Sequence, residues 1–323
     1  MRFLQIHLSL SRGGANVACE NIEDGLLRIG HQCRTLREPA PIAPLNPDHV
    51  LFHSFVSVTS DAYLGVMKEV EELGVPSSLL LHDYWPICDQ TNLVDRNRGW
   101  ERCHAPCGGS CVPKKVGPIE ELKRKALDMN LVCFSNSSAE IVRAATERDV
   151  SVIEHGIDTN LFRPITPQKD PPTVMFCNAW GAKPIKGYKH WEWISTKMTN
   201  AALETTGDTQ HSSMPAFFSE GDLMLFPSLW PETFGLVVIE SMACGKPVVA
   251  YPTGIAGEIL NGENGFVTAT SNPSEMLDLI KYYSAMPLSR REEMSLAARR
   301  TVESRFSLEM MAERYVEHAR RIS

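Results

Sequence analysis

The chain has 323 residues, of which 43% are hydrophobic and 22% charged, so it has a globular composition and enough length for two domains. Its formal net charge of −7 argues against a large nucleic-acid-binding surface, because such surfaces are basic. The start, MRFLQIHLSLSRGG, lacks the features of a signal peptide, and no apolar run approaches the roughly 20 residues that span a bilayer, so we expect a cytoplasmic protein.

Strands and helices alternate along the first half of the chain. Apolar runs predict strands at 3–8, 49–55, 78–81, 131–135 and 151–154. Apolar residues at helical spacing predict helices at 16–29, 61–73 and 139–146. Gly30 and Gly74 stop the first two of these helices.

A polar, proline-rich segment, ITPQKDPP at residues 165–172, predicts a linker between two domains. Beyond it we expect strands at 173–177, 223–226 and 247–251, helices at 188–197, 236–243 and 273–284, and a helical tail at 289–322 with a break near Phe306. This alternation predicts an α/β fold with two Rossmann-like, doubly wound domains, 1–164 and 165–306, which face each other across a cleft.

The most informative stretch is PETFGLVVIESMACGKPVVAYPTG, residues 231–254. It predicts a helix that Gly235 opens and Gly245 closes, with an anion site formed by the backbone amides at the helix start. Glu240 then lies about 12 Å beyond Glu232. That separation suits the two sugar-bearing ends of a nucleotide sugar. The alternative is that Glu232 only caps the helix and Glu240 is a surface acid.

The same stretch resembles the E-x7-E signature of the retaining glycosyltransferases of family 4, which have the GT-B fold. The matching residues are Glu232, Phe234, Gly235, Glu240, Gly245, Pro247 and Val248. The resemblance implies that Glu232 contacts the donor sugar and that Glu240 holds the ribose. It also implies that the loop residues Thr233, Phe234, Gly235 and Leu236 contact the sugar and phosphate.

Other segments extend the resemblance over nearly the whole chain. RGGANVACENIEDGLLRIGHQC resembles the family's first loop and helix, which implies that Gly13 and Gly14 lie under the donor phosphates. LLLHDYWPIC resembles a strand that ends in a His-Asp pair, which implies that His82 binds substrate hydroxyls or positions the reacting centre. In GT-B relatives the last helix, here 307–323, packs back on the N-terminal domain.

Two features depart from the family pattern. FCNAWGAKPIKG keeps Lys186 before a glycine but has no Arg ahead of it, and Lys183 is the candidate substitute. An ammonium group cannot reproduce the bidentate fork of a guanidinium group. The path from Lys186 to Glu232 is also short, so the donor domain is expected to be shortened and its recognition of the base altered.

A cluster of cysteines follows the His-Asp pair. Its members are Cys88, Cys103, Cys107 and Cys111, with His104 among them. Four thiolates could close a tetrahedral structural zinc site, although the spacing is not the usual C-x2-C pair. Free thiols, disulfides and an iron–sulfur cluster are the alternatives. The other five cysteines lie in apolar contexts and are expected in the core.

The function that these features predict is transfer of a hexose from a UDP- or GDP-sugar to an acceptor hydroxyl. The family resemblance implies that the transfer occurs with retention at the anomeric carbon. His82, Glu232 and Lys186 are the expected catalytic residues, and Lys183, Lys186 and the Gly13–Gly14 amides would stabilise the leaving diphosphate. The sequence contains no Asp-x-Asp metal motif, so we expect metal-independent transfer without a catalytic cofactor.

The expected acceptors are polysaccharide or other glycoconjugate, lipid-linked or small-molecule hydroxyls. A peripheral membrane contact is compatible with the sequence, although no long basic amphipathic helix requires it. Three alternatives stay open: a sugar-nucleotide-binding protein that has lost transfer, a glycosyltransferase that modifies nucleic acid, and an enzyme that epimerises a sugar nucleotide.

Overall fold

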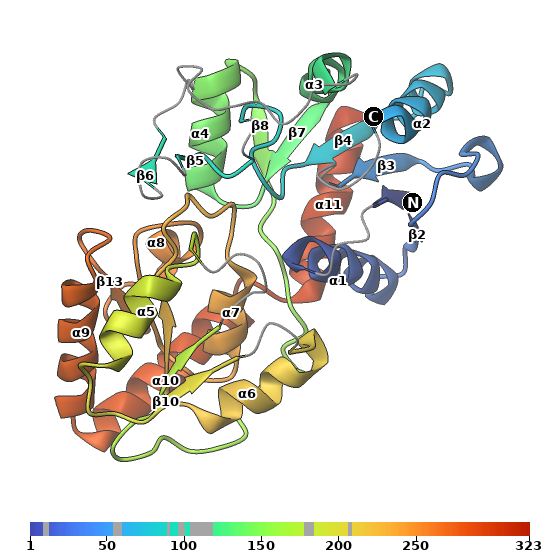
Figure 1. The fold of residues 1–323 in the computed structure, drawn as a ribbon. Coiled ribbons are helices and arrows are strands. Elements are labelled where there is room, and N and C mark those ends of the chain that lie inside the picture. The colour runs from blue at the N-terminus through green and yellow to red at the C-terminus, as the bar shows by residue number, and fades with distance from the viewer. Residues whose placement is uncertain are drawn as a thin grey trace. The chain divides into compact units, whose positions relative to one another are not determined.

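The computed structural model describes residues 1–8, 13–53, 60–88, 91–95, 101–103, 119–177, 184–205 and 209–323. The chain forms two compact units (Figure 1). Unit 1 consists of Met1–Leu93, Cys103–Gly156 and Leu308–Ser323, and unit 2 consists of Val94–Arg102 and Ile157–Ser307. Each unit is built on a parallel sheet, so the predicted class of two Rossmann-like α/β domains is confirmed.

Unit 1 contains a six-stranded parallel sheet in the order β2-β1-β3-β4-β7-β8. Its strands are β1 (Arg2–Ile6), β2 (Gln32–Leu36), β3 (His49–Phe52), β4 (Ser77–Leu80), β7 (Asn130–Cys133) and β8 (Val150–Val152). Its helices are α1 (Gly14–Arg28), α2 (Ser60–Glu72), α3 (Ile119–Asp128), α4 (Asn136–Thr146) and α11 (Leu308–Ile322), with a 3-10 turn η1 (Ala43–Leu45). Because all strands are parallel, their carboxyl ends lie along one edge of the sheet.

The last helix, α11, belongs to unit 1 and packs against α1. Its buried face includes Met311, Tyr315 and Val316. A side chain at Gly25 of α1 would place its Cβ 2.6 Å from the backbone oxygen of Leu308, so a glycine is needed for the two helices to approach this closely.

Unit 2 contains a five-stranded parallel sheet in the order β10-β9-β11-β12-β13. Its strands are β9 (Val174–Phe176), β10 (Ala202–Glu204), β11 (Leu223–Phe226), β12 (Val248–Ala250) and β13 (Gly265–Val267). Its helices are α5 (Tyr188–Ser195), α6 (Met214–Glu220), α7 (Leu236–Ala243), α8 (Ala256–Ile259), α9 (Pro273–Ala285) and α10 (Leu288–Glu303), with a 3-10 turn η3 (His211–Ser213). The short antiparallel pair β5 (Val94–Asp95) and β6 (Glu101–Arg102) is grouped with this unit.

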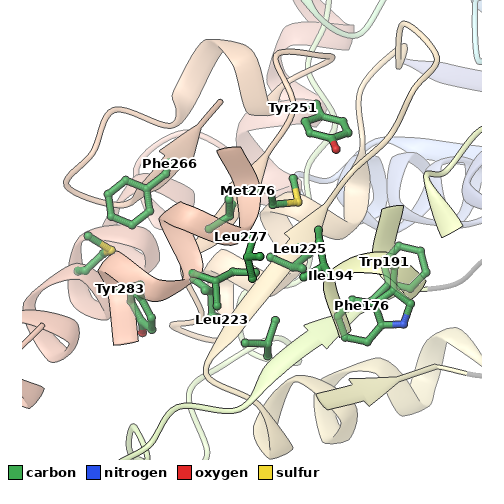
Figure 2. Close-up of a cluster of buried hydrophobic side chains, with 14 residues drawn as sticks. Phe176, Trp191, Ile194, Leu223, Leu225, Tyr251, Phe266, Met276, Leu277 and Tyr283 are labelled. Carbon is green, nitrogen blue, oxygen red and sulfur yellow. The ribbon is translucent and has the colours of Figure 1, made fainter. Parts of the chain in front are cut away.

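One core cluster of unit 2 joins the sheet to α5 and α9 (Figure 2). Phe176 of β9 stacks on Trp191 of α5, with ring centroids 5.4 Å apart. Leu223 and Leu225 of β11 and Leu277 of α9 extend the same cluster. Burial of these side chains anchors β11 in the core of the unit, and the loop that follows this strand carries the candidate site.

The two units divide at Gly156 and Ile157, eight residues before the domain start expected at residue 165. The segment expected to be a linker, 165–172, is bonded within unit 2. Asp170 forms an ion pair of 2.7 Å with Arg291, whose side chain is only 1% exposed. Its proline-rich composition therefore marks a structured surface segment rather than a hinge.

The predicted elements otherwise match the structure to within a few residues, and β11 and α7 have the bounds expected for them. The sequence analysis did not predict the helices α3, α6 and α8 or the β5–β6 pair. It also missed three strands of the parallel sheets, β2, β10 and β13, which have the sequences QCRTL, ALE and GFV. Two of these three strands have only three residues, too few to show an alternating pattern. Within the described residues, no helix is both long enough and apolar enough to cross a bilayer.

Candidate functional site

The loop between β11 and α7 of unit 2 carries most of the predicted site residues. Gly235 is the N-cap of α7, and its φ of +101° lies in the left-handed region that favours glycine. A Cβ there would also lie 2.9 Å from the ring of Phe226. No side chain caps this helix, so Glu232 is not a capping residue. The amide of Val238 donates to the backbone oxygen of Gly235 over 2.9 Å, whereas the amides of the two preceding helix positions have no intrahelical acceptor.

Glu232 is buried in this loop, with 4% of its surface exposed. Its Oε1 atom lies 2.6 Å from Nζ of Lys186 and accepts a second hydrogen bond of 2.6 Å from the hydroxyl of Ser228. The backbone amide of Glu232 donates to Oγ1 of Thr253 over 2.8 Å. Burying a carboxylate is costly unless it is paired, and these contacts supply the pairing.

Lys186 lies in the turn that precedes α5. The turn is close-packed, because a Cβ on Gly187 (φ +79°) would lie 1.9 Å from the backbone oxygen of Pro227. Nζ of Lys186 also lies 5.0 Å from the ring centroid of Trp230. An ammonium group has three donors, and this side chain is 25% exposed. It can therefore hold Glu232 and still donate to an incoming anion.

Glu240, the second glutamate of the motif, is buried in α7 and is not a surface acid. It is 4% exposed, and its Oε1 lies 2.7 Å from Nε2 of His211. His211 belongs to η3 and packs beside Phe162, with ring centroids 5.4 Å apart. A buried carboxylate held by one histidine keeps other acceptor positions that sugar hydroxyls can use.

Gly254 packs directly against the loop that carries Glu232 and Phe234. Its φ is +55°, and a Cβ would lie 2.3 Å from the backbone oxygen of Phe234 and 2.8 Å from Cβ of Glu232. The same oxygen of Phe234 accepts a hydrogen bond of 2.8 Å from the amide of Ile255. The position of Glu232 therefore depends on the absence of a side chain at residue 254.

In unit 1, four histidines follow strands of the sheet near their carboxyl ends. His7 follows β1, His53 follows β3, His82 follows β4 and His155 follows β8. Neighbouring rings are close together: the centroids of His7 and His53 are 5.2 Å apart, those of His53 and His82 5.1 Å, and those of His82 and His155 5.7 Å. We call these four residues the histidine row.

The histidine row is neutral at physiological pH. Burial lowers the pKa of His53 and His82 well below the ordinary value and lowers that of His155 to about 3. Burial also lowers the pKa of His7, and the nearby charge of Arg37 acts in the same direction. His82 is therefore a hydrogen-bonding group here, rather than a cation.

Of the remaining predicted site residues, some lie within the described residues and others do not. Gly13 is the N-cap of α1 and Gly14 is its first residue, and no side chain caps this helix. Their contact with the donor phosphates stays a prediction. Lys183, Cys107 and Cys111 lie outside the described residues. Cys88 is buried and Cys103 is half-buried. The four-cysteine zinc site thus stays a prediction, and the described residues contain no group of three or more His, Cys, Asp or Glu that could hold a metal ion.

The structure brings together some of the predicted residues and adds others. Lys186 and Glu232 are in direct contact, whereas Glu240 has a separate partner. Sequence analysis missed Ser228, Thr253, His211 and three members of the histidine row. A signal for the row is present, because FLQIH, VLFH, LLLH and VIEH each place a histidine after an apolar strand sequence.

Comparison with known families tests the second half of the chain. Residues 188–301 match the family model described as Glycosyl transferases group 1. These residues run from α5 into α10 and include the loop with Glu232, the helix with Glu240 and the glycine turn at Gly254.

Comparison with curated proteins gives short matches. An uncharacterized glycosyltransferase of Methanocaldococcus jannaschii is 33% identical over 96 residues, which are 29% of this chain and 27% of that protein. The lipopolysaccharide core biosynthesis mannosyltransferase LpsB of Rhizobium meliloti is 36% identical over 72 residues, 21% of this chain and 20% of that protein. The aligned segments thus span less than a third of these relatives.

Comparison with solved structures covers the whole chain. Sucrose-phosphate synthase from Thermosynechococcus elongatus has a TM-score of 0.77 at 14% identity, over 99% of each chain. HepE of Anabaena, solved in complex with UDP, has a TM-score of 0.67 at 18% identity, over 99% of this chain and 100% of that one. At this level of identity the likeness shows the fold, which is GT-B.

Proposed function

We propose that this protein is a retaining glycosyltransferase that moves a hexose from a UDP- or GDP-sugar to an acceptor hydroxyl. Unit 2 binds the donor, and unit 1 supplies groups that bind hydroxyls. The observation that carries the proposal is the ion pair between the partly exposed Lys186 and the buried Glu232 at the amino end of α7, the helix that also buries Glu240. The family match over residues 188–301 and the GT-B fold support it.

The charges of the loop suit a diphosphate between two sugars. Carboxylates accept hydrogen bonds from sugar hydroxyls, which gives Glu232 and Glu240 one sugar each. Lys186 and the first-turn amides of α7 are donors to phosphate oxygens. As the bond between the sugar and the diphosphate breaks, negative charge grows on the diphosphate, and these donors stabilise it.

The known relatives support a nucleotide sugar as donor, but they differ in the base of that nucleotide. HepE has been solved with UDP and with UDP-glucose. A mannosyltransferase of Corynebacterium glutamicum, 31% identical over 114 residues, is GDP-mannose-dependent. The relatives also include transferases that build lipopolysaccharide, so we propose a glycan or lipid-linked acceptor. We further propose metal-independent transfer, because Lys186 supplies a positive charge where other enzymes use a metal ion.

Donor consumption tests the proposal. The protein is incubated with UDP-glucose, UDP-N-acetylglucosamine or GDP-mannose, each with and without a panel of sugar, inositol and lipid-linked acceptors, and in the presence of a metal chelator. We expect free nucleotide and a product with the donor's anomeric configuration, read by NMR. Lys186→Met should abolish turnover, whereas Lys189→Met, in the exposed first turn of α5, should not.

Each alternative gives a different result. A binding protein that has lost transfer would bind the nucleotide sugar and leave it unchanged. An epimerase would change the sugar without an acceptor and without releasing nucleotide. An inverted anomeric configuration in the product would contradict retention, and loss of turnover with the chelator would contradict metal independence.

A further inference from the structure

Two members of the histidine row, His53 and His82, are hydrogen-bonded in a chain that starts at Gln5, and the orientation of Gln5 determines the proton positions along this chain. Gln5 of β1 donates from Nε2 to the backbone oxygen of Cys19 over 3.0 Å and to Oγ1 of Thr35 over 3.2 Å. A backbone carbonyl oxygen only accepts hydrogen bonds, so the NH2 end of the Gln5 amide must face Cys19. The other end of the amide, Oε1, therefore faces His53.

The orientation of Gln5 decides the tautomer of His53. Oε1 of Gln5 lies 2.8 Å from Nε2 of His53, so Nε2 must carry the proton that joins them. His53 is fully buried and neutral, and a neutral imidazole has only one N–H. Nδ1 of His53 therefore carries a lone pair and accepts a hydrogen bond.

His53 in turn decides the tautomer of His82. Nδ1 of His53 lies 2.9 Å from Nε2 of His82, and the two rings are within 10° of parallel. Since Nδ1 of His53 accepts, Nε2 of His82 must donate. His82 is also neutral, so its Nδ1 carries the lone pair.

We propose that Gln5 and His53 are positioning residues that fix His82 as a hydrogen-bond acceptor, through Nδ1, for a hydroxyl group of the substrate. The inference rests on the proposed function for the identity of the substrate as a sugar. Through Nδ1, His82 selects a ligand group that has a hydrogen to donate and rejects a phosphate or carboxylate oxygen. The hydroxyl belongs either to the donor sugar or to the acceptor.

The same tautomer is inferred for His7 from a separate set of contacts. Oδ1 of Asn16 accepts a hydrogen bond of 2.9 Å from Arg37, which can only donate, and also contacts Nε2 of His7. Nε2 of His7 must then carry the proton, and Nδ1 the lone pair. Within the described residues this Nδ1 is buried without a partner. The row thus holds three histidines with the proton on Nε2, because separate backbone and guanidinium contacts impose it.

The proton positions can be measured directly in the unliganded protein. Long-range ¹H–¹⁵N NMR spectra of histidine-labelled protein distinguish the two neutral tautomers, and His53→Gln and His82→Gln samples assign the signals. We expect the Nε2–H tautomer for His53 and His82 at pH 7.5. An Nδ1–H tautomer or a charged imidazolium at His82 would overturn the proposal, whatever the protein does with nucleotide sugars.

A variant pair then separates positioning from general stability. Gln5→Leu removes the acceptor that orients His53, so we expect mixed tautomers at His82 and about a tenfold loss of kcat/KM. The matched control is His49→Gln, another buried histidine of the same sheet, whose partner is Ser78. It should keep the tautomer of His82 and the kinetics. Equal kinetic losses in both variants would contradict the positioning role.

Deoxy substrates identify which hydroxyl His82 holds. If the hydroxyl is on the donor, one deoxy donor should lose about tenfold in kcat/KM with the wild type and nothing further with His82→Ala. If it is on the acceptor, a deoxy acceptor should show that pattern. Additive losses for every deoxy compound would show that His82 accepts from no substrate hydroxyl. Failure of the proposed function would appear separately, as absence of nucleotide binding by unit 2.

Discussion

Nζ of Lys186 lies 2.6 Å from Oε1 of Glu232, although the two residues are 46 positions apart in the sequence. The contact ties the turn before α5 to the loop before α7. Because Glu232 is buried and Lys186 is partly exposed, the ammonium group both neutralises the carboxylate and keeps donors available to solvent or ligand.

Replacing Lys186 should destabilise unit 2 through Glu232. In Lys186→Met the buried carboxylate keeps Ser228 but loses its cation, so we expect the free energy of unfolding to fall by about 1–3 kcal/mol, measured by urea denaturation. The double variant with Glu232→Gln should lose less than the sum of the two single variants. Strict additivity would mean that the two side chains do not interact.

A side chain at Gly254 should damage the donor loop specifically. In Gly254→Ala the Cβ would overlap the backbone at Phe234 and press on Glu232. We expect at least a tenfold loss of nucleotide affinity and a loss of about 2 kcal/mol or more in stability, from strain and overpacking together. Gly262→Ala is the matched control, since Gly262 also has a positive φ (+87°) but nothing lies within 4 Å of its Cβ. Similar affinity losses for both would show that backbone strain alone is responsible.

Replacement by alanine should have opposite effects on stability at two helical glycines, because only one of them lies in the contact between α1 and α11. Gly25→Ala would force α11 away from α1, and we expect lower stability and faster hydrogen exchange in α11. Gly65→Ala in α2 meets no atom within 4 Å and should raise stability by up to about 1 kcal/mol, because alanine favours helix. Thermal unfolding of both variants measures the difference. A stabilising Gly25→Ala would contradict the close packing of the two helices.

Buried neutral histidines should make unit 1 sensitive to acid. The pKa of His49 and of His155 is lowered to about 3, and that of His318 to about 4, mainly by burial. Below pH 6.5 the unfolded chain protonates these residues and the native state does not, so the unfolded state binds more protons and stability decreases as the pH is lowered.

Between pH 7 and pH 5 each fully buried histidine of this kind should remove about 2 kcal/mol from the free energy of unfolding. Urea denaturation over this range measures the slope, and His49→Gln should make it shallower. A stability that is constant from pH 7 to pH 5 would show that these rings are already protonated in the native state or are not buried.

The sequence predicted most of the long elements and the centre of the donor loop. LMLF and LVVIESMA lie between glycine, proline and polar residues, and these boundaries place β11 and α7 correctly. The domain boundary was harder to predict. Prolines between 165 and 172 indicate a loop, but only the fold shows that Arg291 binds that loop into unit 2.

The parts of the site that were missed depend on tertiary contacts. His211 lies in a short 3-10 turn with no periodic pattern, and its contact with Glu240 joins residues 29 positions apart. Three members of the histidine row follow strands that are adjacent in the sheet but distant in the sequence, namely β1, β3 and β4, and the fourth follows β8, which β7 separates from β4. In the sequence, each of these histidines is only a single polar residue after a strand. His53 and His82 come into contact because β3 and β4 are neighbours in the sheet.

The most direct test of the account is isothermal titration of UDP, GDP and ADP, and of their glucose and mannose conjugates, into wild-type protein, Glu240→Ala and the control Glu263→Ala. Glu240 is buried in α7, whereas Glu263 is exposed in the turn before β13. We predict that one base binds, that Glu240→Ala loses at least tenfold in affinity and that Glu263→Ala binds as the wild type does. Absence of binding to every nucleotide, or equal binding by Glu240→Ala and wild type, would contradict the donor site proposed for unit 2.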